Sequence, residues 1–217
     1  MSKTPHPAKY SESLLPILAK YCYGDIIDIM GGVGKAGLLK QYNSEIKSVT
    51  INELEQEWAI QAKENGVDKI IIGDARAITG QYNVIVTSPP YGNRMADNFK
   101  PSKPDSRRKM YASDLGRTLS KGSVCCLHFY KKYEFSMTEI VSNFTKNIEH
   151  KRIVWNTSNF IRNFKEIDIF LFYNELFVSF RYQMIAHEQV VTKRQRGVGV
   201  NTNLRVPFED VAVYEKE

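Results

Sequence analysis

The 217-residue sequence has few cysteines, no long apolar run and no basic-then-apolar leader at its start. Its three cysteines show no metal-ligand spacing, and Cys125 and Cys126 are adjacent, where a disulfide rarely forms. The four histidines are scattered, so the sequence predicts no metal site. The longest apolar stretches, such as residues 167–173, are too short to span a bilayer. These absences predict a soluble, cytoplasmic protein with neither a metal nor a membrane partner.

Charge is unevenly distributed along the chain. The net charge is +6, yet residues 1–90 carry 9 basic and 10 acidic side chains, whereas residues 91–217 carry 21 and 14. The excess is concentrated in two polar stretches, 94–109 and 193–196. Such stretches can follow a phosphate backbone, although a solvated basic surface is the alternative interpretation. The candidate nucleic-acid contacts are Arg94, Lys100, Arg107, Arg108, Lys193, Arg194 and Arg196.

Short apolar strands alternate with segments of helical periodicity. Strands are expected at residues 25–30, 48–51, 69–72, 83–87 and 152–158. Helices are expected at residues 11–21 (capped by Ser11 or Ser13), from the glycines to about 42, 53–66, 130–147 and 166–179. Residues 181–191 and 204–216 predict an antiparallel β-hairpin at the sheet edge. The expected fold class is therefore α/β, a doubly wound, mostly parallel sheet with right-handed crossovers. One domain is expected over residues 1–217, with a basic loop insertion at about 92–122.

The glycine-rich stretch after the first strand predicts a ligand-binding turn. A nucleoside-triphosphate P-loop would need glycine at Ile29 and Ser or Thr at Ala36, so that interpretation fails. Gly32-x-Gly34-x-x-Gly37 opens a helix and is followed about twenty residues later by Glu53, which fits a nucleoside-containing cofactor. A tight turn without a ligand is the alternative.

Three acidic residues lie at or near successive strand ends. Asp28 precedes the glycines, where a carboxylate would repel a dinucleotide pyrophosphate but attract a cationic amino group. Glu53 could hold ribose hydroxyls, and Asp74 could accept a hydrogen bond from an adenine amino group. Together they suit S-adenosylmethionine, which carries a sulfonium, an ammonium, a ribose diol and an adenine.

The fourth strand ends on Ser88-Pro89-Pro90-Tyr91. The two prolines hold the chain in one extended shape and leave their carbonyls free to accept hydrogen bonds. Ser88 adds a further acceptor, and Tyr91 offers a flat face on which a base can stack. Such a site could bind the hydrogens of an exocyclic amine and turn the nitrogen lone pair towards a methyl donor. In duplex substrate the base must first be flipped out.

These motifs, in this order, resemble those of the DNA amino-methyltransferases that methylate N4 of cytosine or N6 of adenine, in the gamma arrangement. The stretches 107–117, 154–162 and 194–216 resemble small DNA methylases of the phage type. The resemblance implies S-adenosyl-L-methionine as cofactor, bound also by Tyr10 and Met30, and DNA as partner, preferably double-stranded. It implies a bacterial or phage-infected host cell as the setting. Ile29 and Met30 depart from the family's Pro and Phe.

Several functional alternatives stay open at this point. Ser88 in the first tetrad position favours N4 of cytosine over N6 of adenine, and an RNA amino-methyltransferase is a third interpretation. An NAD-dependent oxidoreductase would use the glycine turn but leave the Ser-Pro-Pro-Tyr stretch without a role. A catalytically idle nucleic-acid-binding module would retain the fold. No separate target-recognition domain is expected, so base readout would depend on the loops at 92–122 and 193–203 or on a partner. Homodimerisation is left open.

Overall fold

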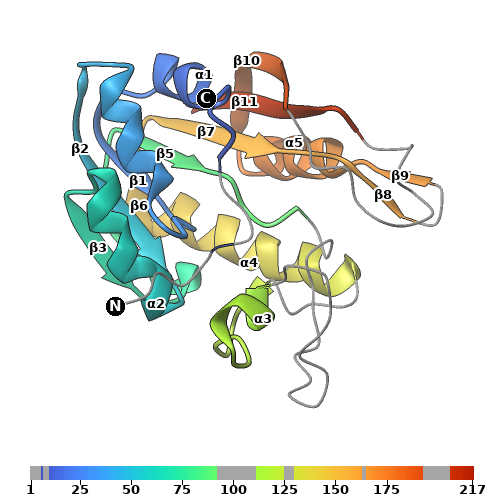
Figure 1. The fold of residues 1–217 in the computed structure, drawn as a ribbon. Helices are drawn as coiled ribbons and strands as arrows, with labels where there is room; N and C mark the ends of the chain where they lie inside the picture. The colour runs from blue at the N-terminus through green and yellow to red at the C-terminus, as the bar shows by residue number, and fades with distance from the viewer. Residues whose placement is uncertain (1–5, 7–9, 92–110, 125–129, 163–164, 193–205) are drawn as a thin grey trace.

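The structure is a computed structural model that describes residues 6, 10–91, 111–124, 130–162, 165–192 and 206–217. Its centre is a seven-stranded sheet of order β10-β11-β7-β5-β1-β2-β3 (Figure 1). The five strands from β7 to β3 are mutually parallel, while β11 runs antiparallel to both of its neighbours. The seven strands are β1 (Gly24–Asp28), β2 (Ile46–Glu53), β3 (Lys69–Ile72), β5 (Val84–Thr87), β7 (Arg152–Thr157), β10 (Tyr182–Val191) and β11 (Phe208–Lys216). The predicted α/β sheet and its final antiparallel hairpin are confirmed.

Helical segments cover both faces of this sheet. They are α1 (Leu15–Lys20), η1 (Lys35–Gln41), α2 (Gln56–Ala59), η2 (Ile60–Asn65), η3 (Ala75–Ala77), α3 (Tyr111–Leu115), α4 (Tyr130–Asn147) and α5 (Ile169–Ser179). The described residues also form two small two-stranded sheets. One pairs β4 (Gly80–Gln81) with β6 (Ile148–Glu149), and the other pairs β8 (Phe160–Arg162) with β9 (Lys165–Ile167). Within the described residues, no helix is long and apolar enough to cross a membrane.

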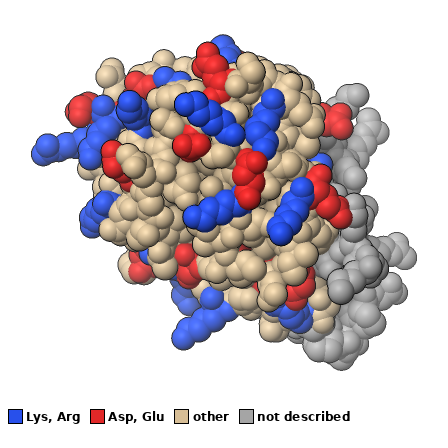
Figure 2. Space-filling view, turned by 90° about the vertical axis from the view of Figure 1, so that its left-hand side faces the viewer, with Lys and Arg blue, Asp and Glu red and all other residues tan. Residues whose placement is uncertain are grey.

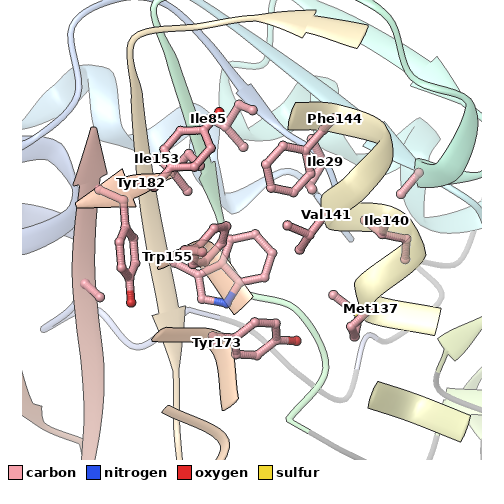
Figure 3. Packing of buried hydrophobic residues seen from close by; sticks show 14 of the residues in the cluster. Ile29, Ile85, Met137, Ile140, Val141, Phe144, Ile153, Trp155, Tyr173 and Tyr182 are labelled. Atoms are coloured by element: carbon pink, nitrogen blue, oxygen red, sulfur yellow. The ribbon is translucent and has the colours of Figure 1, made fainter. Parts of the chain in front are cut away.

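Successive side chains along each strand point to opposite faces of the sheet, which divides the core into two layers. Ile26 belongs to a cluster with α1 and η1 on one face, whereas its neighbour Ile27 packs with α4 and α5 on the other. Trp155 lies at the centre of the second layer, between the sheet and the helices (Figure 3). Because both faces are covered, ligands can approach the parallel strands only at their ends.

Some local expectations were wrong. Neither Ser11 nor Ser13 caps α1, since Leu14 occupies the N-cap without a side-chain bond and the two hydroxyls bond each other. The helix expected to end at Gly66 begins as α2 and continues as a 3₁₀ segment, η2; Gly66 does close it, at φ 80°. Residues 111–122, predicted as part of a loop insertion, contain α3 and a segment bound to the domain.

Candidate functional site

The candidate site lies at the carboxyl edge of the parallel strands, where Asp28 and Glu53 end β1 and β2. Asp74 follows β3, and Ser88 follows β5. Since β1, β2, β3 and β5 are parallel, these four residues meet at one edge of the sheet. The topology therefore brings together the residues that the sequence nominated separately.

Asp28 is buried, with 1% of its surface exposed, and three donors hold its carboxylate. Tyr10 donates its hydroxyl to Oδ2 at 3.0 Å, while Thr87 Oγ1 (2.7 Å) and the Met30 amide (3.1 Å) donate to Oδ1. Burial dominates over these bonds and raises the pKa of Asp28 from 3.8 to about 6. The sequence analysis named Tyr10 and Met30 only as cofactor-binding residues, and it did not reveal that both of them, together with Thr87, donate to Asp28.

Glu53 joins the end of β2 to the glycine turn. Its Oε2 accepts the Gly32 amide at 2.8 Å and its Oε1 accepts the Glu55 amide at 2.9 Å. Burial raises the pKa of Glu53 from 4.5 to about 7. Each carboxylate oxygen has a second lone pair, so the side chain can hold the turn and still accept hydroxyl groups.

The glycines of the turn are required by conformation and by close packing. Gly32 and Gly34 have φ values of 51° and 74°, in the left-handed region. A Cβ on Gly34 would lie 2.4 Å from the Ala62 side chain, and one on Gly37 would lie 2.3 Å from the Asn65 carbonyl oxygen. The turn therefore packs directly against η2, as expected for the third glycine of such a fingerprint.

Asp74 has local partners. It caps η3 by accepting the Arg76 amide at 2.9 Å, and it forms an ion pair with the Arg76 guanidinium at 3.0 Å. The same guanidinium donates to the Gly122 carbonyl, which brings the segment after α3 against the end of β3. An adenine amino group would have to share this carboxylate with Arg76.

Residues 117–120 are bound to the end of β2 by a network that the sequence did not predict. Arg117 forms ion pairs with Glu55 at 2.8 Å and Glu57 at 2.6 Å, and Ser120 donates to Glu55 through both its amide and its hydroxyl. A hollow of about 420 Å³ lies beside this network, next to the ends of β2 and β3. It is lined by Leu54, Gln56, Glu57, Ile60, Ile72, Arg117 and Ser120.

The Ser88-to-Tyr91 stretch is held by side chains from distant elements. Ser88 Oγ and the Tyr91 hydroxyl lie 2.9 Å apart, and Tyr91 also donates to Glu209 Oε2. Asn156 Nδ2 lies within 3.0 Å of all three oxygens. The Tyr91 ring is partly buried against the α4 and α5 layer, rather than fully open to a stacking base as the sequence interpretation requires.

The two prolines are held in place by burial and by a hydrogen bond from helix α4. Pro89 is buried, and the Pro90 carbonyl accepts the Tyr133 hydroxyl of α4 at 2.7 Å. Tyr133 in turn shares a hydrogen bond with Tyr173 of α5, at 2.5 Å. The predicted stiffness of the turn therefore has a tertiary cause as well as a local one.

Two buried carboxylates at this edge have no cation beside them in the described part of the chain. Among those residues no Lys, Arg or His forms an ion pair with Asp28 or Glu53, although both are at most 9% exposed. Burying a carboxylate without a counter-charge is unfavourable, and a cationic ligand would remove that cost. The two carboxylates of Asp28 and Glu53 thus fit a ligand that carries an amino or sulfonium cation and a pair of hydroxyl groups.

The predicted phosphate contacts fall outside the described residues. All seven, from Arg94 to Arg196, lie in stretches 92–110 and 193–205. On one face of the described domain, Lys and Arg side chains are interspersed with Asp and Glu (Figure 2). That face therefore shows no patch of positive charge alone that could bind a phosphate backbone. In the part of the chain that the structure covers, no group of three or more His, Cys, Asp or Glu residues could hold a metal ion.

Comparisons with known proteins inform the fold. No protein family and no curated protein matches this sequence. Among solved structures, the N-methyltransferase NodS of Bradyrhizobium japonicum, in complex with S-adenosyl-L-homocysteine, is similar over 94% of this chain and 84% of its own, with a TM-score of 0.55 and 9% identity. An S-adenosylmethionine-dependent methyltransferase of Leishmania major gives 0.55 and 10% identity, over 94% and 70%. The B. subtilis tRNA methyltransferase TrmK gives 0.53 and 12%, over 96% and 67%. This chain therefore has the Rossmann-like fold of the class I methyltransferases.

Proposed function

We propose that the protein is an S-adenosylmethionine-dependent methyltransferase that modifies an exocyclic amino group of a nucleobase. The observation that carries the proposal is the direct connection between the candidate cofactor-binding residues and the candidate amine-binding turn. Thr87 binds the Asp28 carboxylate, and the next residue, Ser88, begins the rigid acceptor turn. A cation held at Asp28 and an amine held at Ser88 would therefore be neighbours.

The cofactor would be held by residues at the ends of β1, β2 and β3. Asp28 would receive its amino group, Glu53 its ribose hydroxyls and Asp74 its adenine, with Tyr10, Met30 and the glycine turn around them. The two uncompensated carboxylates and the class I fold support this assignment. When bound, the cofactor would supply an electrophilic methyl group, carried on its sulfonium, to the lone pair of the target amine.

The target amine would be held by Ser88 Oγ and the Pro89 carbonyl, with its ring against Tyr91. DNA is the proposed substrate, and N4 of cytosine is favoured over N6 of adenine because serine occupies the first position of the turn. The partly buried Tyr91 ring implies that a base would contact only its open side or would displace it. RNA is the second candidate substrate, since one structural neighbour is named as a tRNA methyltransferase.

The test is incorporation of labelled methyl groups into DNA and RNA, followed by mass spectrometry of the nucleosides. We expect N4-methylcytosine from double-stranded DNA, and loss of the product in Tyr91→Ala while S-adenosylhomocysteine still binds. Methylated RNA with unmodified DNA would transfer the proposal to RNA. Binding of NAD in place of S-adenosylhomocysteine, in a calorimetric titration, would overturn it.

A further inference from the structure

A hydrogen-bonded chain leads from the acceptor turn to a carboxylate on the last strand. It runs from Ser88 Oγ to the Tyr91 hydroxyl at 2.9 Å, and from there to Glu209 Oε2 at 2.5 Å. Glu209 lies on β11, 118 positions away from Tyr91 in sequence. Glu209 and Asn156 lie in two of the stretches that resemble DNA methylases, but the sequence analysis named neither as a site residue.

The number of hydrogens on each group decides which group donates in each of these hydrogen bonds. An ionised carboxylate only accepts hydrogen bonds, so the single hydroxyl hydrogen of Tyr91 points to Glu209. The Tyr91 oxygen must then accept at its contact with Ser88, so the Ser88 hydrogen points to Tyr91. Ser88 Oγ keeps two lone pairs, and Asn156 Nδ2 at 3.0 Å can take one of them. The remaining lone pair can only accept, which is what an incoming N–H group needs.

Asn156 lies within hydrogen-bond distance of all three oxygens and can donate to two of them at a time. It is fully buried on β7, and its amide nitrogen lies 2.8 Å from Glu209 Oε2 and 2.9 Å from the Tyr91 oxygen. An amide has two N–H hydrogens and no ionisable proton, so it can hold this geometry without taking part in proton transfer. The cluster thus contains one fixed donor, two hydroxyls and one carboxylate.

We propose that Glu209 orients the Ser88 hydroxyl and is the final acceptor of the proton that leaves the methylated amine. This inference rests on the proposed function. After the N–C bond forms and the S–C bond breaks, the nitrogen carries one proton in excess. That proton moves to Ser88 Oγ, the Ser88 proton moves to the Tyr91 oxygen, and the Tyr91 proton moves to Glu209. The amine product is neutral and Glu209 is protonated until solvent removes the proton.

The test is a double-mutant cycle of Glu209→Gln and Tyr91→Phe. Phenylalanine keeps the stacking ring and removes only the hydroxyl link. Each variant should lower kcat by at least about tenfold, with little change in KM or in S-adenosylhomocysteine binding. The double variant should be no slower than the slower single variant, because both interrupt one chain. Glu209→Asp should recover part of the missing rate.

Glu215→Gln is the matched control, since it removes a carboxylate of the same strand that pairs with Arg152 away from the turn. It should keep the wild-type kcat. Wild-type kcat in both Glu209→Gln and Tyr91→Phe, or fully additive decreases, would overturn the inference while leaving the methyltransferase proposal intact. An inactive wild-type enzyme on every nucleic acid would overturn both. The melting temperatures of the two single variants and the double variant give the same cycle without measuring turnover. We expect the shifts in melting temperature to be non-additive, and additive shifts would contradict a single linked network.

Discussion

At the scale of single residues, Asp28 combines a stability cost with the binding role proposed for it. Desolvation raises its pKa from 3.8 to about 6, so the folded state binds its proton more tightly than the unfolded state does. Stability is therefore lost as the pH rises from about 4 to 6. The penalty is fully present at pH 8, where a shift of this size corresponds to roughly 3 kcal/mol at most.

Asp28→Asn should stabilise the protein at pH 8, because it removes the buried charge and keeps an oxygen for Thr87 and the Met30 amide. The melting temperature should rise by several degrees, and the gain should vanish below about pH 4. Asp25→Asn, at the exposed start of the same strand, is the control and should change little. A lower melting temperature for Asp28→Asn at pH 8 would contradict this account.

The same carboxylate should make cofactor affinity depend on pH. A cationic ligand favours ionised Asp28, so S-adenosylmethionine should bind more tightly as the pH rises from 5 to 7.5, by up to about tenfold per unit below pH 6. Calorimetry in buffers of different ionisation enthalpy should detect proton release on binding. The dependence should be much weaker in Asp28→Asn. A wild-type affinity that is constant between pH 5 and 7.5 would exclude this role.

At the scale of elements, the turn after β1 depends on contact with η2. An added Cβ at Gly37 would meet the Asn65 oxygen at 2.3 Å and the Val67 nitrogen at 2.8 Å, and neither backbone atom can rotate away. Gly37→Ala should therefore lower stability by about 1–3 kcal/mol and weaken cofactor binding through the displaced turn. Thermal unfolding and titration with S-adenosylhomocysteine measure both effects.

Gly73→Ala provides the comparison for that change. An added Cβ at Gly73 would find its nearest atom, Asn52 Oδ1, at 3.9 Å, which is ordinary contact. It should cost much less stability than Gly37→Ala. Equal destabilisation by the two alanine variants would show that the contact with η2 is not the cause.

At the scale of the whole molecule, the uneven charge distribution predicts where the proposed DNA substrate would bind. Replacing Arg107 and Arg108 by Ala should lower the slope of log affinity against log salt by about one unit for each phosphate that the protein no longer neutralises. Lys63→Ala, on the exposed side of η2, should leave the slope unchanged. Binding isotherms at several salt concentrations measure it. An unchanged slope for the arginine variants would mean that these side chains face solvent without touching phosphate.

The strands, and the positions of Asp28, Glu53 and Ser88 at or just beyond the strand ends, could be predicted from the sequence because their signals are local. The isoleucines and valines of β1, β3 and β5 form short apolar runs. The small pairs β4–β6 and β8–β9 were missed because two- and three-residue strands carry almost no periodicity. The cap of α1 was misjudged because Ser11 and Ser13 bond each other instead of the helix.

The sequence by itself determined the order of strands and helices, the acidic residues at their ends and the stiff proline turn. Only the tertiary structure decided what those residues touch. Insertion of β11 between β7 and β10 brings Glu209 to the Ser88 turn, and the pairing of β7 with β5 brings Asn156 there. The pairing of β1 with β5 brings Thr87 to Asp28. Periodicity reports which face of a strand is buried, whereas neighbours across a sheet depend on long-range pairing that leaves no local pattern.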